Sequence, residues 1–231
     1  MKVLDLVFPK RCAGCGRIGS YICQECEVGR WEEEQVCPSC GRKSAYGERH
    51  LRCTDRSLDG VVSLYAYDGL VKRIIEKAKH KGCFDLLNEL ISGESKWGDR
   101  QDLSHWSRWV KENEPVIVPV PLGRRKERER GFNQAEIIGL RLGQNLGLKV
   151  KNGLVRIKDA DKYTGRNRAE REKILNGAFM VRPQFKSGLK DQKVLLVDDI
   201  WTTGATLREC GRVLREAGVR QVWGWVVAER G

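Results

Sequence analysis

The sequence predicts an α/β protein with a parallel sheet flanked by helices, preceded by a small cysteine-rich domain that binds zinc. The first observation is an alternation, after about residue 55, of short aliphatic runs with segments of helical periodicity. That order of strand, helix and strand builds parallel sheets covered by helices. The second observation is that seven of the nine cysteines precede residue 54. We therefore expect a zinc-binding head over residues 1–55 and an α/β domain over residues 56–231, packed together because no low-complexity linker separates them.

The elements of the second part follow from the spacing of its apolar residues. Four short apolar runs are predicted strands: 61–68, 115–121, 193–199 and 221–228. Five segments with helical features are predicted helices: 70–78, 83–93, 103–112, 133–145 and 204–217. The fourth helix begins at Asn133, a residue type suited to capping. In parallel sheets ligands bind at the carboxyl ends of the strands, so we look for chemistry there.

The composition describes a folded and strongly basic chain. Hydrophobic residues make up 40% of the sequence and charged residues 32%, which favours a folded soluble protein over a disordered one. Lysine and arginine number 43 against 31 acidic residues, a formal net charge of +12. Such an excess favours polyanionic partners, either nucleic acid or small phosphorylated ligands. No apolar run is long enough for a membrane span or a signal peptide, so we expect a cytoplasmic protein whose clustered cysteines bind metal.

The segment DDIWTTGAT (198–206) is the clearest sign of a ligand site. Asp198 and Asp199 are expected to leave the strand at the carboxyl edge of the sheet, directly before a turn into a helix. The residues of that turn form a phosphate cradle of backbone N–H groups, hydroxyls and the helix dipole: Thr202, Thr203, Gly204, Ala205 and Thr206. The carboxylates suit ribose hydroxyls or Mg²⁺ held through water, so the segment favours a ribose 5-phosphate. The alternative is a simple helix cap, for which Asp and Thr are common.

The same segment resembles the phosphoribosyl-diphosphate signature of type I phosphoribosyltransferases, in which hydrophobic residues precede two acids and T-T-G-x-T. The stretches VPVPL and RGFNQ resemble the ComF family, competence-associated proteins with a phosphoribosyltransferase domain. LVKRIIEKAKHKG, with Lys79, and AER…GAF (169–179) resemble other stretches of that family. The resemblance implies a type I phosphoribosyltransferase fold, catalytic and substrate-binding roles for Asp198 and Asp199, and substrate binding by residues 202–206.

The resemblance also implies cationic residues around a diphosphate. Arg124 and Arg125 open a predicted loop of mixed charge after the strand 115–121, where cations stabilise a departing diphosphate. Without that position, a run of mixed charge is commonly only solvated surface. Arg171, in the stretch AER, is the third arginine for which the resemblance implies substrate binding.

The region of residues 163–179 corresponds to the mobile hood that closes over the substrate in type I enzymes. Here the chain departs from the family pattern, which more often has Gln at Tyr163, Leu or a similar residue at Arg166, and Asn at Ile174. The loss of amide groups in the hood bears on catalysis more than on ligand binding.

The cysteines of the head have the spacing of zinc ligands. Three C-x-x-C pairs and the stretch HLRC supply eight candidate ligands: Cys12, Cys15, Cys23, Cys26, Cys37, Cys40, His50 and Cys53. Two residues between ligands allow a tight knuckle, and glycines that follow two of the pairs assist the turn. The simplest pairing is sequential, with the first four and the last four as sets. An interleaved pairing, or Cys53 as a bystander, stays open. Four protein ligands per ion make such zinc structural.

Two functions from different classes follow. The first is an enzyme that transfers ribose 5-phosphate from phosphoribosyl diphosphate, with Mg²⁺, to a nitrogen nucleophile, or the reverse. The second is a non-catalytic protein of the same fold that binds single-stranded DNA. The resemblance implies a role in natural competence, in which DNA is taken up for transformation, and partners in the DNA-uptake machinery. The sequence does not identify the acceptor base, the number of zinc ions or the oligomeric state.

Overall fold

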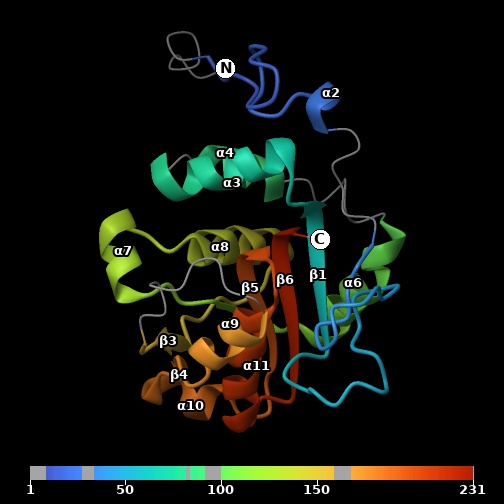
Figure 1. Ribbon diagram of the computed structural model, residues 1–231, viewed down its shortest axis with the longest axis vertical. Coiled ribbons are helices and arrows are strands. Elements are labelled where there is room, and N and C mark those ends of the chain that lie inside the picture. The colour runs from blue at the N-terminus through green and yellow to red at the C-terminus, as the bar shows by residue number, and fades with distance from the viewer. Residues whose placement is uncertain (1–8, 28–33, 82–83, 92–99, 159–167, 231) are drawn as a thin grey trace.

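The computed structural model describes residues 9–27, 34–81, 84–91, 100–158 and 168–230. Its centre is a parallel sheet of four strands in the order β1-β6-β5-β2 (Figure 1). Their bounds are β1 Gly60–Ala66, β2 Val116–Pro119, β5 Lys193–Trp201 and β6 Gln221–Glu229. A further parallel bridge joins Ile117 of β2 to Val150 at the outer edge. The chain therefore has the parallel sheet that its alternating pattern predicts.

The two faces of the sheet are covered by different helices. In β5, Leu195 and Val197 pack into a core formed with α3 (Gly69–Lys81), α4 (Phe84–Ile91), α6 (Ser104–Asn113) and α8 (Gln134–Leu146). Val194 and Leu196 point to the opposite face, where they pack with α11 (Ala205–Glu216). Successive side chains of a strand alternate between faces, so a run of four fully buried aliphatic residues requires cover on both sides.

Smaller elements surround the sheet. They are α2 (Gln24–Glu27), a 3₁₀ turn at Gln101–Leu103, α7 (Arg124–Arg130), β3 (Leu154–Arg156), α9 (Arg168–Leu175), β4 (Phe179–Val181) and α10 (Pro183–Leu189). Strands β3 and β4 pair antiparallel beside α11. Figure 1 shows α3 and α4 above the carboxyl ends of the central strands, and α7 projecting at the edge next to α8. In the described part of the chain, no helix is both long and apolar enough to span a membrane.

The predicted strands and helices are present with small shifts at their ends, and two predictions are wrong. The strand predicted to end at Asp199 continues to Trp201, because β6 keeps pairing with it as far as Trp201↔Glu229. The aspartates therefore lie within β5 rather than after it. The basic run after β2 is the helix α7 and not a loop, with Gly123 and Gly131 at its two ends. Of the two cysteines that follow the head, Cys210 is fully buried and Cys83 lies outside the described residues.

The cysteine-rich segment packs on the rest of the chain in two places. Ile22, beside the first cysteine set, belongs to the core on the α4 side, and its N–H donates to Glu89 Oε1 at 3.3 Å. The second set is fastened to β1, since Val61 N–H donates to Gly47 O at 2.8 Å. Gln35 Oε1 accepts from Ser63 N–H at 2.8 Å in the same region. Both parts of the chain pack together as expected, and the boundary at residue 55 stays a prediction.

Candidate functional site

The carboxyl edge of the sheet opens between β2 and β5. The register pairs Pro119 with Val197, and Val120 N–H donates to Val197 O at 2.9 Å, after which the chain turns away toward α7. Beyond Val197, β5 continues beside β6 alone among the described strands. Asp198 and Asp199 lie at this point of divergence, the position at which parallel sheets bind ligands.

The two aspartates have different surroundings. Asp199 Oδ2 forms an ion pair at 2.7 Å with Lys79 Nζ from α3, and both side chains are largely buried, at 14% and 20% exposure. Asp199 N–H also donates to Asp198 Oδ1 at 2.8 Å. Burial and the neighbouring charge of Asp199 raise the pKa of Asp198 to about 7, although that N–H group, Lys79 and Arg156 act in the opposite direction. The pair therefore holds one carboxylate in an ion pair with Lys79 and one whose pKa lies near neutral pH.

The turn after β5, which the sequence predicts to be a phosphate cradle, leads into α11 through a glycine. Gly204 ends it with φ of 73° and begins α11. A Cβ at this position would lie 2.3 Å from the Trp201 ring and 2.6 Å from Arg208 Nη1, so only glycine fits. Thr202 is exposed, and Thr203 and Thr206 are partly exposed. Gly204 occupies the N-cap of α11, so neither aspartate caps the helix, whereas Thr203 Oγ1 accepts from Ala205 N–H at 3.5 Å. A capping role of the threonine therefore stays open beside ligand binding.

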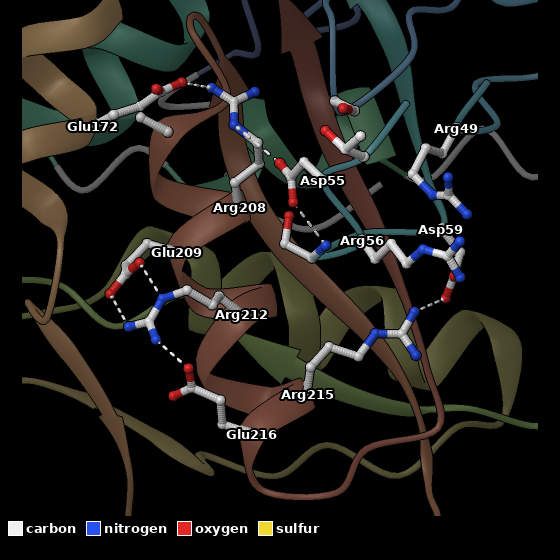
Figure 2. Close-up of a pocket in the computed structure, with 14 residues that line it drawn as sticks. Arg49, Asp55, Arg56, Asp59, Glu172, Arg208, Glu209, Arg212, Arg215 and Glu216 are labelled. Carbon is white, nitrogen blue, oxygen red and sulfur yellow. Dashed lines mark hydrogen bonds and ion pairs between the residues drawn. The ribbon is translucent and has the colours of Figure 1, made fainter. Parts of the chain in front are cut away.

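Arg208 joins this turn to the cysteine-rich segment. Its guanidinium is 8% exposed and donates to Thr203 O at 2.6 Å and to Glu172 Oε1 of α9 at 2.6 Å. It also donates to Pro38 O, between Cys37 and Cys40, at 2.9 Å. Figure 2 shows Arg208 reaching from α11 toward Glu172 and Asp55. A single arginine one turn into a helix belongs to no motif, so the sequence offered no signal for this role.

The predicted diphosphate arginines are not equivalent. Arg124 lines a polar cavity of about 300 Å³ at the carboxyl end of β2, together with Arg156 and Arg182, which the sequence did not indicate. Arg125 points elsewhere and forms an exposed contact with Glu129 at 3.4 Å. Arg156 connects this cavity to the aspartates, because its charge lowers the pKa of Asp198. The lining of the cavity includes neither aspartate.

Next to this cavity, Asn133 caps α8 as expected. Its Oδ1 accepts from Ala135 N–H at 3.2 Å, and its Nδ2 donates to Val120 O at 2.9 Å. The cap therefore also fixes the end of β2.

Residues 163–167 of the predicted hood lie outside the described residues, and residues 168–175 form α9. Tyr163, Arg166 and the side chain of Arg171 lie outside them, although Arg171 belongs to α9. Ile174 is partly buried in the same helix. The altered hood pattern and the role of Arg171 therefore stay predictions.

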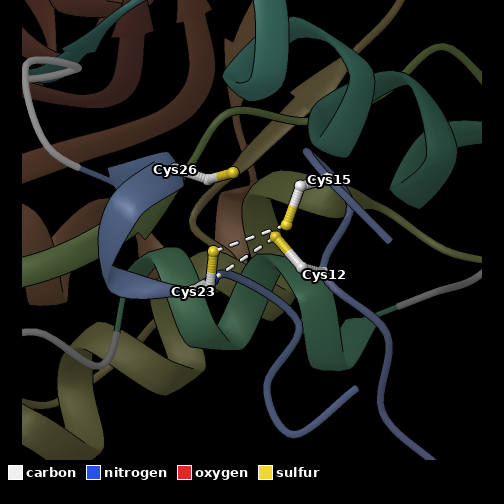
Figure 3. Close-up of side chains that lie close together, drawn as sticks. All are labelled: Cys12, Cys15, Cys23 and Cys26. Carbon is white, nitrogen blue, oxygen red and sulfur yellow. Dashed lines mark hydrogen bonds between the residues drawn. The ribbon is translucent and has the colours of Figure 1, made fainter. Parts of the chain in front are cut away.

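The first cysteine set converges on one point (Figure 3). The Sγ atoms of Cys12, Cys15, Cys23 and Cys26 lie within 4.8 Å of one another, and those of Cys15 and Cys23 are 3.6 Å apart. A tetrahedral ion with Zn–S bonds of about 2.3 Å places sulfur atoms about 3.8 Å apart, so the set fits Zn²⁺. Burial alone would raise the pKa of Cys12, but N–H groups of Cys15, Cys23 and Gly14 lower it to about 6, which favours the thiolate.

The second set has the same form with one histidine. Ligand atoms of Cys37, Cys40, His50 and Cys53 lie within 4.8 Å, with Cys40 Sγ 3.4 Å from His50 Nδ1. His50 Nε2 lies 3.0 Å from Lys43 O, so the ring can donate there and keep Nδ1 for a metal, as zinc-binding histidines do. The glycines after the two knuckles, Gly16 and Gly41, have φ of 79° and 74°. The structure thus brings together the sequential sets and not an interleaved pairing.

Comparison with known proteins agrees with this two-part organisation. Residues 3–55 match the double zinc ribbon domain, and residues 131–231 match the phosphoribosyl transferase domain. Competence protein ComFC of Bacillus subtilis (strain 168) is 29% identical over 79% of this chain and 72% of its own length. The chain belongs to the ComF family. Competence protein F of Haemophilus influenzae (strain ATCC 51907 / DSM 11121 / KW20 / Rd) is 37% identical to this ComF chain over 47% of it and 48% of its own length.

The fold of this family member is that of the type I phosphoribosyltransferases with a cysteine-rich zinc-binding part, as its sequence predicts. The ligand chemistry of the head is that of structural zinc. Among solved structures, glutamine phosphoribosylpyrophosphate amidotransferase from B. subtilis, complexed with ADP and GMP, matches 48% of this chain and 22% of its own chain. The identity is 18% and the TM-score 0.33, values too low to bear on the ligand.

Proposed function

We propose that this ComF-family protein binds phosphoribosyl diphosphate, or another ribose 5-phosphate, at the carboxyl edge of the sheet and acts in natural competence. The observation that supports it best is the position of Asp198 and Asp199 beside the Thr202–Thr206 turn, where β2 and β5 diverge. Phosphate oxygens suit the N–H groups of a turn that opens a helix, and ribose hydroxyls suit carboxylates. The competence role follows from the names of the relatives.

Different residues of the site bind different groups of the ligand. Thr202, Thr203, Gly204, Ala205 and Thr206 receive the 5-phosphate, and Arg124, with its neighbours Arg156 and Arg182, receives the diphosphate. Asp198 and Asp199 take the ribose hydroxyls or hold Mg²⁺ through water, for which oxygen ligands are suited. Mg²⁺, when bound, neutralises charge that develops on the diphosphate. A role for Arg171 remains part of the proposal only through the family resemblance, whereas Arg125, which pairs with Glu129 outside the cavity, is no longer assigned to the ligand.

In the enzymatic form of the proposal, the bond between C1 of the ribose and the diphosphate oxygen breaks, and a bond from C1 to an acceptor nitrogen forms. The acceptor loses a proton and diphosphate leaves. No covalent nucleophile on the protein is needed, because closed-site electrostatics stabilise the developing positive charge. The acceptor is a nitrogen nucleophile whose identity the described residues do not specify.

Asp198→Asn tests the ligand site. Asn keeps the shape but not the charge, and hydrogen bonds to charged groups are worth about 1.5–3 kcal/mol, so affinity for phosphoribosyl diphosphate with Mg²⁺ should fall about 10- to 100-fold at pH 8. The double variant with Asp199→Asn should lose more. Calorimetric titration of the folded variants measures this, and equal affinity in wild type and Asp198→Asn would exclude the proposed role.

A second candidate function is binding of single-stranded DNA. It is favoured by α7, which has no buried residue and carries five basic residues (Arg124, Arg125, Lys126, Arg128 and Arg130) against two acidic ones, Glu127 and Glu129. The observed slope of log affinity against log salt should then be about −0.7 per phosphate contacted. Exchange of labelled diphosphate into phosphoribosyl diphosphate supports the enzyme, and a steep salt slope without such exchange supports the binding protein.

We also propose that the two cysteine sets hold structural Zn²⁺, one ion each. Neither set leaves an open coordination position, because each supplies four ligands. Metal analysis of anaerobically prepared protein should find about two equivalents of zinc, and about one in Cys26→Ser or Cys53→Ser. Protein without zinc would exclude the assignment.

A further inference from the structure

A cavity of about 980 Å³ lies between α11 and the segment that follows the second cysteine set (Figure 2). It runs along α11 from Ala205 and Arg208 near the amino end to Arg215 and Glu216 at the carboxyl end. At 1.5 Å per residue, Arg215 lies about 15 Å along the helix axis from Ala205. The far end of the cavity is therefore separate from the phosphate cradle of the proposed function.

Three buried polar atoms in the lining have no partner. Ser57 is 8% exposed, and its Oγ has no hydrogen bond to any described atom. The same holds for the buried Nε atoms of Arg49 and Arg215. All three residues line this one cavity. Buried polar groups are normally paired, and these three are all able to donate, so the cavity is suited to a ligand rich in acceptor oxygens.

The charges of the lining are separated along the cavity. Arg208 and Arg212 pair with four carboxylates along one side of the cavity: Asp55, Glu172, Glu209 and Glu216. At the other end, Arg215 pairs with Asp59, whose Oδ2 also accepts from Val222 N–H at 2.9 Å. Figure 2 shows Arg49 and Arg56 directed toward that same end.

Arg49 and Arg56 have no compensating carboxylate among the described residues. Arg49 Nη1 donates to the carbonyl oxygens of His50 and Cys53, at 3.3 and 2.9 Å, which have no formal charge. Arg56 is exposed, and no ion pair joins it to a described residue. Three arginines therefore gather beside Asp59, while the nearby Asp55 accepts from Ser57 N–H at 2.9 Å and lies 3.9 Å from Arg208.

We propose that this end of the cavity, formed by Arg49, Arg56, Ser57 and Arg215, binds a phosphate group. Guanidinium groups match the geometry of phosphate oxygens by paired N–H bonds, and a serine hydroxyl adds a further donor. The phosphate belongs either to a nucleic-acid strand or to a small phosphorylated molecule. The site goes beyond the proposed function and shares none of the residues assigned to it.

Two variants and one control isolate the site. Arg56→Glu reverses a charge on an exposed side chain, and Ser57→Ala removes a hydroxyl that holds nothing in the fold, so both should remain folded. Arg52→Glu is the matched control, because Arg52 is exposed in the same segment but does not line the cavity. Circular dichroism and zinc content verify that each variant retains its structure.

The probes are inorganic phosphate and a 5′-phosphorylated thymidine tetranucleotide, titrated by calorimetry at constant ionic strength. Arg56→Glu should weaken phosphate binding 10-fold or more, Ser57→Ala about 3- to 10-fold, and Arg52→Glu less than 2-fold. If the tetranucleotide follows the same pattern, the ligand is a strand; if only inorganic phosphate does, it is a small phosphorylated molecule. The proposed site is wrong if Arg56→Glu loses no more affinity for the probes than Arg52→Glu does. It is also wrong if Ser57→Ala binds both probes with the affinity of the wild type.

A third titration separates this proposal from the first. Arg56→Glu should bind phosphoribosyl diphosphate with Mg²⁺ as tightly as the wild type does. Asp198→Asn should bind phosphoribosyl diphosphate more weakly but should bind inorganic phosphate at the Arg56 site as the wild type does. The two titrations therefore test the two proposed sites independently.

Discussion

Lys79 of α3 and Asp199 of β5 form an ion pair of 2.7 Å at the carboxyl edge of the sheet, although 120 positions separate them in the chain (199 − 79 = 120). The lysine gives the candidate site its own counter-ion. Of the two adjacent carboxylates, Asp199 is paired with this cation, while burial and its neighbour raise the pKa of Asp198. A ligand with phosphate groups must therefore enter a site whose charges are already balanced.

Removal of Lys79 should destabilise the protein through an unpaired charge. Lys79→Met leaves Asp199 largely buried without its cation, which should cost about 1–3 kcal/mol, between the values for exposed and for fully buried pairs. Adding Asp199→Asn should restore part of that stability, since the isolated charge is then gone. Urea unfolding measures all three proteins. Lys77→Met on the exposed face of the same helix is the control, and an equal loss there would show that the ion pair is not the cause.

The raised pKa of Asp198 predicts a pH dependence of stability. An acid whose pKa rises from 3.8 unfolded to about 7 folded binds more protons in the folded state between these values. Its contribution to stability is therefore present at low pH and is lost as the pH rises through about 7. Asp198→Asn should remove this loss, so the stability of the variant relative to wild type should increase from pH 5 to pH 8. Thermal unfolding across that range provides the test; a difference independent of pH would contradict it.

Ionisation of Asp198 lowers the stability of the protein but should raise its affinity for the ligand. If Mg²⁺ or a ribose hydroxyl requires the ionised carboxylate, affinity for phosphoribosyl diphosphate with Mg²⁺ should rise between pH 6 and pH 8. The rise should be reduced in Asp198→Asn. A pH profile identical in the two proteins would assign the titration to another group, for instance the ligand itself.

Loss of the second zinc site should make the turn before α11 more mobile, because Arg208 connects the two. Its guanidinium binds both Pro38 O and Thr203 O, so either Arg208→Met or Cys53→Ser should loosen the turn before α11. Amide hydrogen exchange at Thr203 and Ala205 should accelerate 10-fold or more in each variant, with little further effect in the double variant. Arg212→Met, on the same helix, is the control. Additive effects of the two changes would mean that no such connection exists.

The two predicted diphosphate arginines should behave differently. Arg124 lines the cavity at the end of β2, whereas Arg125 contacts only Glu129 at the surface among the described residues. Arg124→Ala should weaken phosphoribosyl diphosphate binding about 10-fold, and Arg125→Ala should change it less than 2-fold. Both should reduce single-stranded DNA affinity by a similar small factor, because both residues are exposed on α7. Equal effects of the two substitutions on phosphoribosyl diphosphate would contradict the cavity as its site.

The features that depend on neighbouring residues in sequence were predictable, and those that depend on distant partners were not. The apolar run Val194–Val197 and the C-x-x-C spacing express local geometry, so the strand and the ligand sets follow from them. The length of β5 depends on β6, which continues the pairing as far as Trp201. Lys79 and Arg208 act through contacts made by the folded chain, and a single basic residue has no pattern that distinguishes it from a solvated one.

The strand order has a consequence for synthesis of the chain. Within the described sheet, β1 joins the other strands only through β6, which is the last strand to be made. During translation from the amino end, β1 and the second cysteine set must therefore wait, without their sheet partner, until almost the whole chain has left the ribosome. A metal ion that organises residues 37–53 early would shield this waiting segment from aggregation. Zinc starvation should then reduce the yield of newly made protein far more than it harms protein that has already folded.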